Sequence, residues 1–260
     1  MTTVRDDYNY RRIAKSPRDA HAFQPDARIF VSHAGPDADT AQMLRKRLDS
    51  AQRENILLRT AKAERALYVE PIDRVYETQS DAIAVRRNNL GMKYLDHDLA
   101  KAFRNFLDAV AQDENFALAH NNLGLVFLEI GDIFKALEHF NKAIELDDNL
   151  DVAYGNRGLA HLESGDFEAA YEDFEKALEL DQYDPMHYNN AGVLFLDLEV
   201  PAKARDYFNA AIELDPQNPL PYKNRGLAYR EIGDNHQARA DFIKATALEE
   251  EQYQATFGAS

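Results

Sequence analysis

The sequence predicts an all-α protein, an α-solenoid of about five helix–turn–helix repeats that follows an irregular and partly helical N-terminal region. Three residue types recur between residues 91 and 242 at a spacing of 34, with a single step of 33. Agreement among three separate series over five copies indicates a structural repeat rather than chance. The series are Gly91, Gly124, Gly158, Gly192 and Gly226; Ala102, Ala136, Ala170, Ala204 and Ala238; and Phe106, Phe140, Phe174, Phe208 and Phe242.

Each copy is predicted to form two short helices joined by a tight turn. The first helix carries Asn-x-Gly, and the missing side chain of its mid-helix glycine allows tight packing. The turn is often Gly-Asp, as at Gly131–Asp132. Glycine favours the left-handed conformation that ends a helix, and aspartate caps the next one. In the second helix Ala170, Phe174 and Ala177 stand at i, i+4 and i+7 and form one apolar stripe.

The arrangement of Tyr154, Gly158, Ala170, Phe174 and Ala177 resembles the small–large–small signature of the tetratricopeptide repeat (TPR) family. This resemblance implies stacked helix pairs in a right-handed superhelix, with a concave face lined by the first helices and no catalytic activity. The departures are a shorter first repeat and Glu199 in place of the turn glycine of repeat four, which put the local turn geometry in question. The expected repeats are 84–116, 117–150, 151–184, 185–218 and 219–252.

The remaining segments are assigned by composition. Residues 1–36 are predicted to be an irregular arm, and residues 37–83 a helical extension. Residues 253–260 are a tail too short for a further capping helix, so we expect Tyr253 and Phe257 to fold back or a neighbouring chain to cover the open end.

A short segment, 28–48, is similar to the opening strand, loop and helix of TIR domains. No alternating β pattern follows Leu48, and the repeats begin within about 50 residues of it, too soon for the remaining strands of such a domain. The sequence therefore favours a fortuitous match. A TIR-like NAD-cleaving or signalling protein is kept as a remote alternative.

Composition narrows the classes of function. The chain has no cysteine, which excludes disulfides and Cys-ligated metals. Its eight histidines lack metal-ligand spacing, and no glycine-rich phosphate loop occurs. We expect no catalytic residues, no metal site and no cofactor. No apolar run is long enough to cross a membrane and the start does not look like a secretory signal, so a soluble cytoplasmic protein is expected.

The charge is uneven along the chain. The formal net charge is −15, and residues 81–260 hold 33 acidic against 16 basic side chains, a balance of −17. So acidic a region repels nucleic-acid phosphates and anionic lipids, and it favours a basic protein partner. The N-terminal arm is basic. It is a candidate contact for an acidic surface of the repeats, in the same chain or in a homo-oligomer, and the uncapped C-terminal repeat is a second candidate for self-association.

Three rows of side chains are predicted to line the concave groove. A carboxamide can pair with both the C=O and the N–H of a peptide unit, so an asparagine row could hold an extended peptide. Residues three and seven positions further on share its helix face. The alternative readings are that the amides make contacts between helices and that the acids are merely solvated. The rows are Asn89, Asn122, Asn156, Asn190 and Asn224; Met92, Leu125, Leu159, Val193 and Leu227; and Asp96, Glu129, Glu163, Asp197 and Glu231.

The sequence thus predicts a non-catalytic adaptor that binds an extended, basic or hydrophobic–basic segment of a partner protein in the concave groove. The alternative is a structural subunit of a multiprotein complex, held through the outer faces and the ends of the array. Neither nucleic-acid binding nor membrane insertion is expected.

Overall fold

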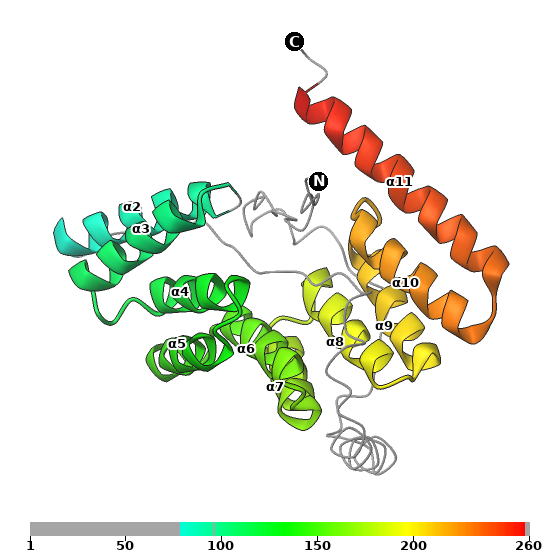
Figure 1. Ribbon diagram of the computed structural model, residues 1–260, viewed down its shortest axis with the longest axis horizontal. Helices are drawn as coiled ribbons and strands as arrows, with labels where there is room; N and C mark the ends of the chain where they lie inside the picture. Colours follow the sequence, from blue (N-terminus) through cyan, green and yellow to red (C-terminus); the bar gives the residue numbers. More distant parts are fainter. Residues whose placement is uncertain (1–78, 96, 258–260) are drawn as a thin grey trace. The chain divides into compact units, whose positions relative to one another are not determined.

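The chain forms an all-α solenoid of helix pairs, and the computed structural model describes residues 79–95 and 97–257 (Figure 1). These residues form ten helices and no strand. They divide into two units, which meet in sequence at Ser164 and Gly165 and are described separately. The predicted arm, most of the helical extension, the TIR-like segment and Asp96 lie outside the described residues. The right-handed superhelix stays a prediction.

The first unit contains two complete helix pairs and the first helix of a third. Helix α2 packs against α3, and α4 packs against α5. Helix α6 then lies against both α5 and α4, so first helices contact one another as well as their partners. The bounds are α2 (Gln79–Tyr94), α3 (Leu99–Gln112), α4 (Ala117–Glu129), α5 (Ile133–Leu146) and α6 (Asp151–Ser164).

The second unit follows the same plan. Helices α8 and α9 form one pair and α10 and α11 the next, while α10 also packs on α9 and α8. The bounds are α7 (Phe167–Leu180), α8 (Pro185–Asp197), α9 (Pro201–Leu214), α10 (Pro219–Ile232) and α11 (Asn235–Phe257).

The turns between paired helices behave as the sequence predicts. The carboxylate of Asp132 accepts a hydrogen bond from the backbone N–H of Lys135 at 3.2 Å and caps α5. Gly131 has a φ of 80°, the left-handed conformation that glycine adopts without strain. Glu199 takes the same conformation, with a φ of 56°. The turn of repeat four is therefore kept although its glycine is missing, at a cost of about 1–2 kcal/mol for a residue with a Cβ.

The core of each pair is a phenylalanine ring placed on a glycine. A Cβ added to Gly124 would lie 2.5 Å from the ring of Phe140, closer than any real contact allows. The ring is fully buried and clusters with Leu125, Ala136 and Ala160. The same close approach joins Gly91 to Phe106, Gly192 to Phe208 and Gly226 to Phe242.

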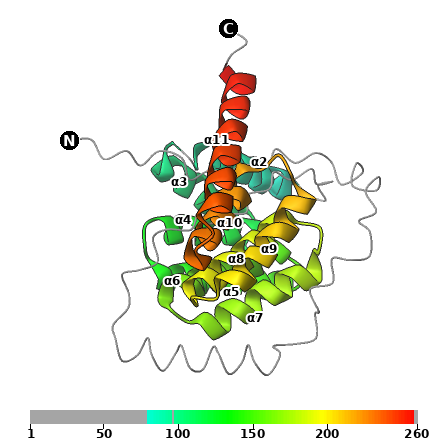
Figure 2. The same cartoon turned by 90° about the vertical axis from the view of Figure 1, so that its right-hand side faces the viewer.

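The C-terminal end differs from expectation. Helix α11 continues to Phe257 and extends beyond the end of α10 (Figure 2), so residues 253–257 are helix rather than tail. The side chain of Tyr253 in this helix is 67% exposed. The physical reason is that residues 246–257 contain neither proline nor glycine, so nothing in this stretch stops the helix.

Candidate peptide-binding surface

The asparagine row lies inside the protein. Asn122, Asn156, Asn190 and Asn224 are fully buried, and Asn89 is half-buried. Their side-chain amides link neighbouring first helices. The Nδ2 atoms of Asn122, Asn156 and Asn224 donate to the Oδ1 atoms of Asn88 at 2.8 Å, Asn121 at 2.9 Å and Asn189 at 2.8 Å.

The accepting asparagines were missed by the sequence argument. Each stands immediately before the Asn of its own repeat, so the signal was the Asn–Asn doublet at 88–89, 121–122 and 189–190. Within a doublet the first amide also donates to the second, as from Asn121 Nδ2 to Asn122 Oδ1 at 3.2 Å. These chains of amides satisfy polar groups that burial would otherwise make costly.

The apolar row is also mostly internal. Met92, Leu125, Leu159 and Val193 are buried, and Leu227 is half-buried. Leu125 belongs to the cluster around Phe140, which shows that this row packs within and between repeats. Burial thus gives both rows a structural role. Their contact with a ligand peptide is not tested by the chain alone and stays a prediction.

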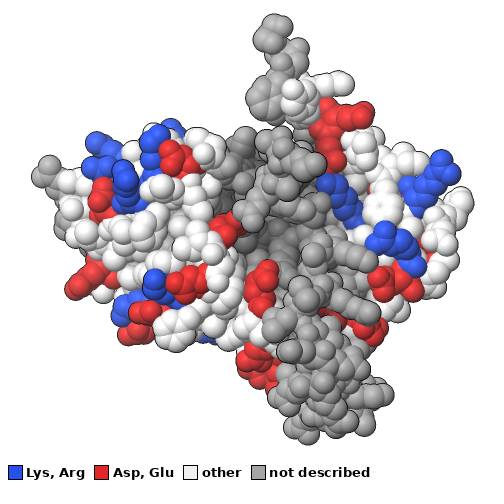
Figure 3. All heavy atoms as spheres, in the orientation of Figure 1, with Lys and Arg blue, Asp and Glu red and all other residues white. Residues whose placement is uncertain are grey.

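The acidic row is the accessible one. Glu129, Glu163 and Glu231 are exposed and Asp197 is half-buried, each within two residues of the end of its first helix. A helix C-terminus carries partial negative charge, so acids at this position destabilise the helix. Figure 3 shows acidic side chains on the described surfaces of both units.

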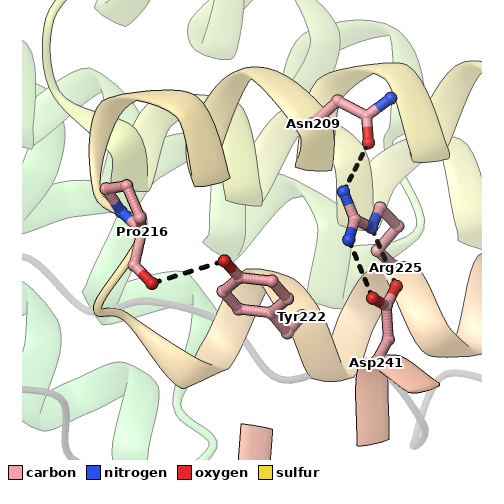
Figure 4. Close-up of polar contacts among 5 residues, drawn as sticks. All are labelled: Asn209, Pro216, Tyr222, Arg225 and Asp241. Atoms are coloured by element: carbon pink, nitrogen blue, oxygen red, sulfur yellow. Dashed lines mark hydrogen bonds and ion pairs between the residues drawn. The ribbon is translucent and has the colours of Figure 1, made fainter. Parts of the chain in front are cut away.

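A second polar cluster, which the sequence argument did not find, joins α9, α10 and α11 (Figure 4). Arg225 donates to both carboxylate oxygens of Asp241, at 2.8 and 2.7 Å, and to Asn209 Oδ1 at 2.8 Å. Its guanidinium also lies over the rings of Tyr222 and Tyr229, 5.4 and 5.8 Å from their centroids. Desolvation lowers the pKa of Arg225, but the hydrogen bond to Asp241 and the negative charge of Asp241 outweigh this effect, so the pKa of Arg225 is raised.

This cluster has a counterpart in the first unit. Arg157 donates to Asn141 Oδ1 at 2.7 Å, and the two residues are 16 positions apart, as Arg225 and Asn209 are. The arginine therefore acts as a brace between a first helix and the preceding second helix. The repeated spacing could have revealed it in the sequence.

Residues 79–95 and 97–257 contain no group of three or more His, Asp or Glu side chains placed to hold a metal ion. Among the described helices, none combines the length and the apolar character that a membrane crossing requires.

The buried amide bonds predict a stability effect for Asn122→Ala. The substitution deletes the donor to Asn88 and leaves buried polar atoms of Asn88 and Asn121 without their partner. We expect the free energy of unfolding to fall by about 1–3 kcal/mol, because buried groups lose their hydrogen bonds without regaining water. Urea unfolding followed by circular dichroism measures it. Asn149→Ala, at an exposed site, is the control, and equal stability of the two variants would contradict the structural role.

Four matches to models of the tetratricopeptide repeat cover residues 117–150, 152–184, 188–218 and 207–240. They coincide with the helices from α4 to the start of α11. The comparison with curated proteins gave no match.

Solved structures show the same fold. TTC0263, a thermophilic TPR protein of Thermus thermophilus, is 18% identical, with a TM-score of 0.60 over 64% of this chain and 91% of that one. Cut9, from the APC/C hetero-tetramer Cut9–Hcn1, is 24% identical, with a TM-score of 0.59 over 64% of this chain and 33% of that one. PilF of Pseudomonas aeruginosa is 21% identical, with a TM-score of 0.57 over 70% of this chain and 96% of that one. These structures share the fold, and the four matched repeats show that the chain belongs to the tetratricopeptide repeat proteins.

Proposed function

We propose that the protein is a non-catalytic interaction module that binds an extended, basic or hydrophobic–basic segment of a partner protein along the ends of its first helices. The TPR fold and its neighbours support a protein-interaction or scaffold module in general. The finer proposal rests on one observation, the exposed carboxylates of Glu129 and Glu163 at the ends of two neighbouring first helices of the first unit.

The acidic row supports this proposal because its glutamates expose negative charge at the ends of their first helices. A cationic segment laid across these helix ends would neutralise both the carboxylates and the partial charge of the helix termini. The net charge of −17 over residues 81–260 would also speed the approach of a basic partner.

The amide and apolar rows enter the proposal only as predicted contacts. A ligand that used the amide of Asn122 would compete with its bond to Asn88. A ligand that touches only the acidic row would leave that bond in place. The two modes differ in a measurable way, because substitution of the buried amides would lower stability and binding together, whereas substitution of the exposed acids would weaken binding with a smaller effect on stability.

Charge reversal tests the acidic row. We expect the double variant Glu129→Lys/Glu163→Lys to bind a 12- to 14-residue Lys/Leu peptide at least about tenfold more weakly than the wild type at low salt. The difference should shrink at high salt because exposed charges are screened. Fluorescence anisotropy with a labelled peptide measures both effects.

The matched control carries the same change of charge elsewhere. Glu172 on α7 and Glu250 on α11 are exposed, so Glu172→Lys/Glu250→Lys alters the net charge equally without touching the row. Equal weakening by the two double variants would show that only net charge matters and would reject the acidic row as a binding surface.

A scaffold subunit is the second candidate, and one observation favours it. Phe134 and Ile130, at the turn between α4 and α5, are 79% and 58% exposed, which suits a contact with another subunit. Cut9, with a similar fold, was crystallised as part of a hetero-tetramer. Capture of a cellular partner by the wild type, by the acidic variant and by Phe134→Ser separates the candidates, since a partner lost only from Phe134→Ser would support the scaffold.

A further inference from the structure

Two histidines meet between α4 and α5 in the second repeat. The Nδ1 atom of His120 lies 3.2 Å from the Nδ1 atom of His139, and the Nε2 atom of His120 lies 3.1 Å from the backbone oxygen of Glu114. His120 is buried, and the ring of His139 stacks on Phe127 at 5.3 Å with an interplanar angle of 11°. The polar contact between His120 and His139 thus joins α4 to α5 beside the ring of Phe127.

The contacts determine where the protons lie. A backbone carbonyl can only accept, so Nε2 of His120 must carry a proton. A neutral imidazole has one N–H, which leaves Nδ1 of His120 as an acceptor and makes Nδ1 of His139 the donor. The remaining Nε2 atom of His139 then has a lone pair and is the next site to be protonated.

We propose that this histidine pair makes the packing of α4 against α5 sensitive to acid, tolerating one added proton but not two. The first proton, on Nε2 of His139, leaves the donor and acceptor of the Nδ1–Nδ1 bond in place. The second, on Nδ1 of His120, removes the acceptor and sets two cations in contact. The bond then becomes a repulsion inside the helix pair of repeat two.

The surrounding charges do not offset a second proton. Around His120, desolvation lowers the pKa, the Glu114 carbonyl raises it, Lys142 lowers it and Asp113 raises it. Around His139, desolvation and then the charge of His120 lower the pKa, while Glu138 raises it.

Two further cations stand on the helices that pack around the pair. On α5, Lys135 is placed over the ring of Phe127, the ring on which His139 stacks. On α6, Arg157 bonds to Asn141 of α5. Within residues 79–95 and 97–257, neither imidazole forms an ion pair that would neutralise the second charge.

The direction of the effect follows from these shifts. For both histidines the pKa is lower in the folded chain than in the unfolded one, so the unfolded chain binds more protons as the solution is acidified. The stabilisation is complete above the ordinary histidine pKa of about 6.5 and is lost as the pH falls below it. The loss should begin above the range in which most carboxylates titrate.

Urea unfolding of the full chain at about pH 7.5 and about pH 5, on either side of the ordinary histidine pKa, tests the proposal. His120→Tyr introduces the residue found at the equivalent Tyr154, and His139→Asn the residue at Asn105. For the wild type we expect the urea midpoint to be lower at about pH 5 than at about pH 7.5. For each variant we expect this decrease to be no more than about half as large. His97→Gln, at an exposed site, should keep the whole fall. If both pair variants keep it too, the proposal is overturned.

Nitrogen-15 NMR of the imidazoles provides a test that does not depend on variants. At neutral pH we expect His120 as the Nε2–H tautomer and His139 as the Nδ1–H tautomer. On acidification His139 should titrate before His120. The opposite tautomer for His120, or independent titration of both rings at the ordinary histidine value, would overturn the proposal.

Discussion

Replacing Phe140 by alanine is expected to lower the free energy of unfolding by about 3–5 kcal/mol, the usual cost of deleting a fully buried phenylalanine ring. The ring lies against the backbone of Gly124 and within the cluster of Leu125, Ala136 and Ala160. Because α4 and α5 meet through this ring, the cavity would lie between two rigid helices that cannot close it. Urea unfolding followed by circular dichroism at 222 nm measures the loss.

Phe134→Ala is the matched control, since it makes the same chemical change on the same helix. Phe134 is 79% exposed, so its removal should alter stability by no more than about 0.5 kcal/mol. Neighbouring repeats contribute to stability through local contacts, and the Phe140 variant should therefore also broaden the transition. A loss below about 1 kcal/mol would show that the glycine–phenylalanine contact is not the core of the repeat.

The second large effect is expected for Asp241→Ala. The substitution leaves the guanidinium of Arg225 partly buried without its carboxylate, and only the bond to Asn209 and the two tyrosine rings remain. Breaking one side of a buried ion pair costs about 3–5 kcal/mol, because the remaining charge is neither paired nor fully hydrated. The side chains of Arg225 and Asp241 are only 19% and 7% exposed, so solvent screening is limited.

Two further variants separate this pair from ordinary surface charges. Asp206→Ala removes an exposed ion pair with Arg205 and should change stability little. Arg225→Met/Asp241→Leu removes both buried charges and should be more stable than Asp241→Ala alone. A double variant as unstable as the single one would show that the shape of the brace, rather than its charge, holds α9, α10 and α11 together.

Much of the fold follows from local chemistry and could be predicted from the sequence. The turn at Gly131–Asp132 is specified by one residue that tolerates a left-handed backbone and one that caps the next helix. The 34-residue spacing of Gly124 and Phe140 with their counterparts shows which residues form the core, because a repeat must bury the same positions in every copy. The conformation of Glu199 was harder to predict, because glutamate does not favour a left-handed backbone. Only the helices on either side hold it in the conformation that glycine would adopt freely.

The sequence alone determined the helix pairs, the tetratricopeptide repeat family and the acidic character of residues 81–260. Helical spacing also placed Asn122, Leu125 and Glu129 on one face of the first helix. Which part of that face meets solvent was decided only by the tertiary structure. Helix α2 covers the amide, where Asn88 supplies the hydrogen bond, and the cluster around Phe140 buries the leucine. The carboxylate at the helix end is left exposed. The physical reason is that periodicity describes one helix, whereas burial depends on what packs against it.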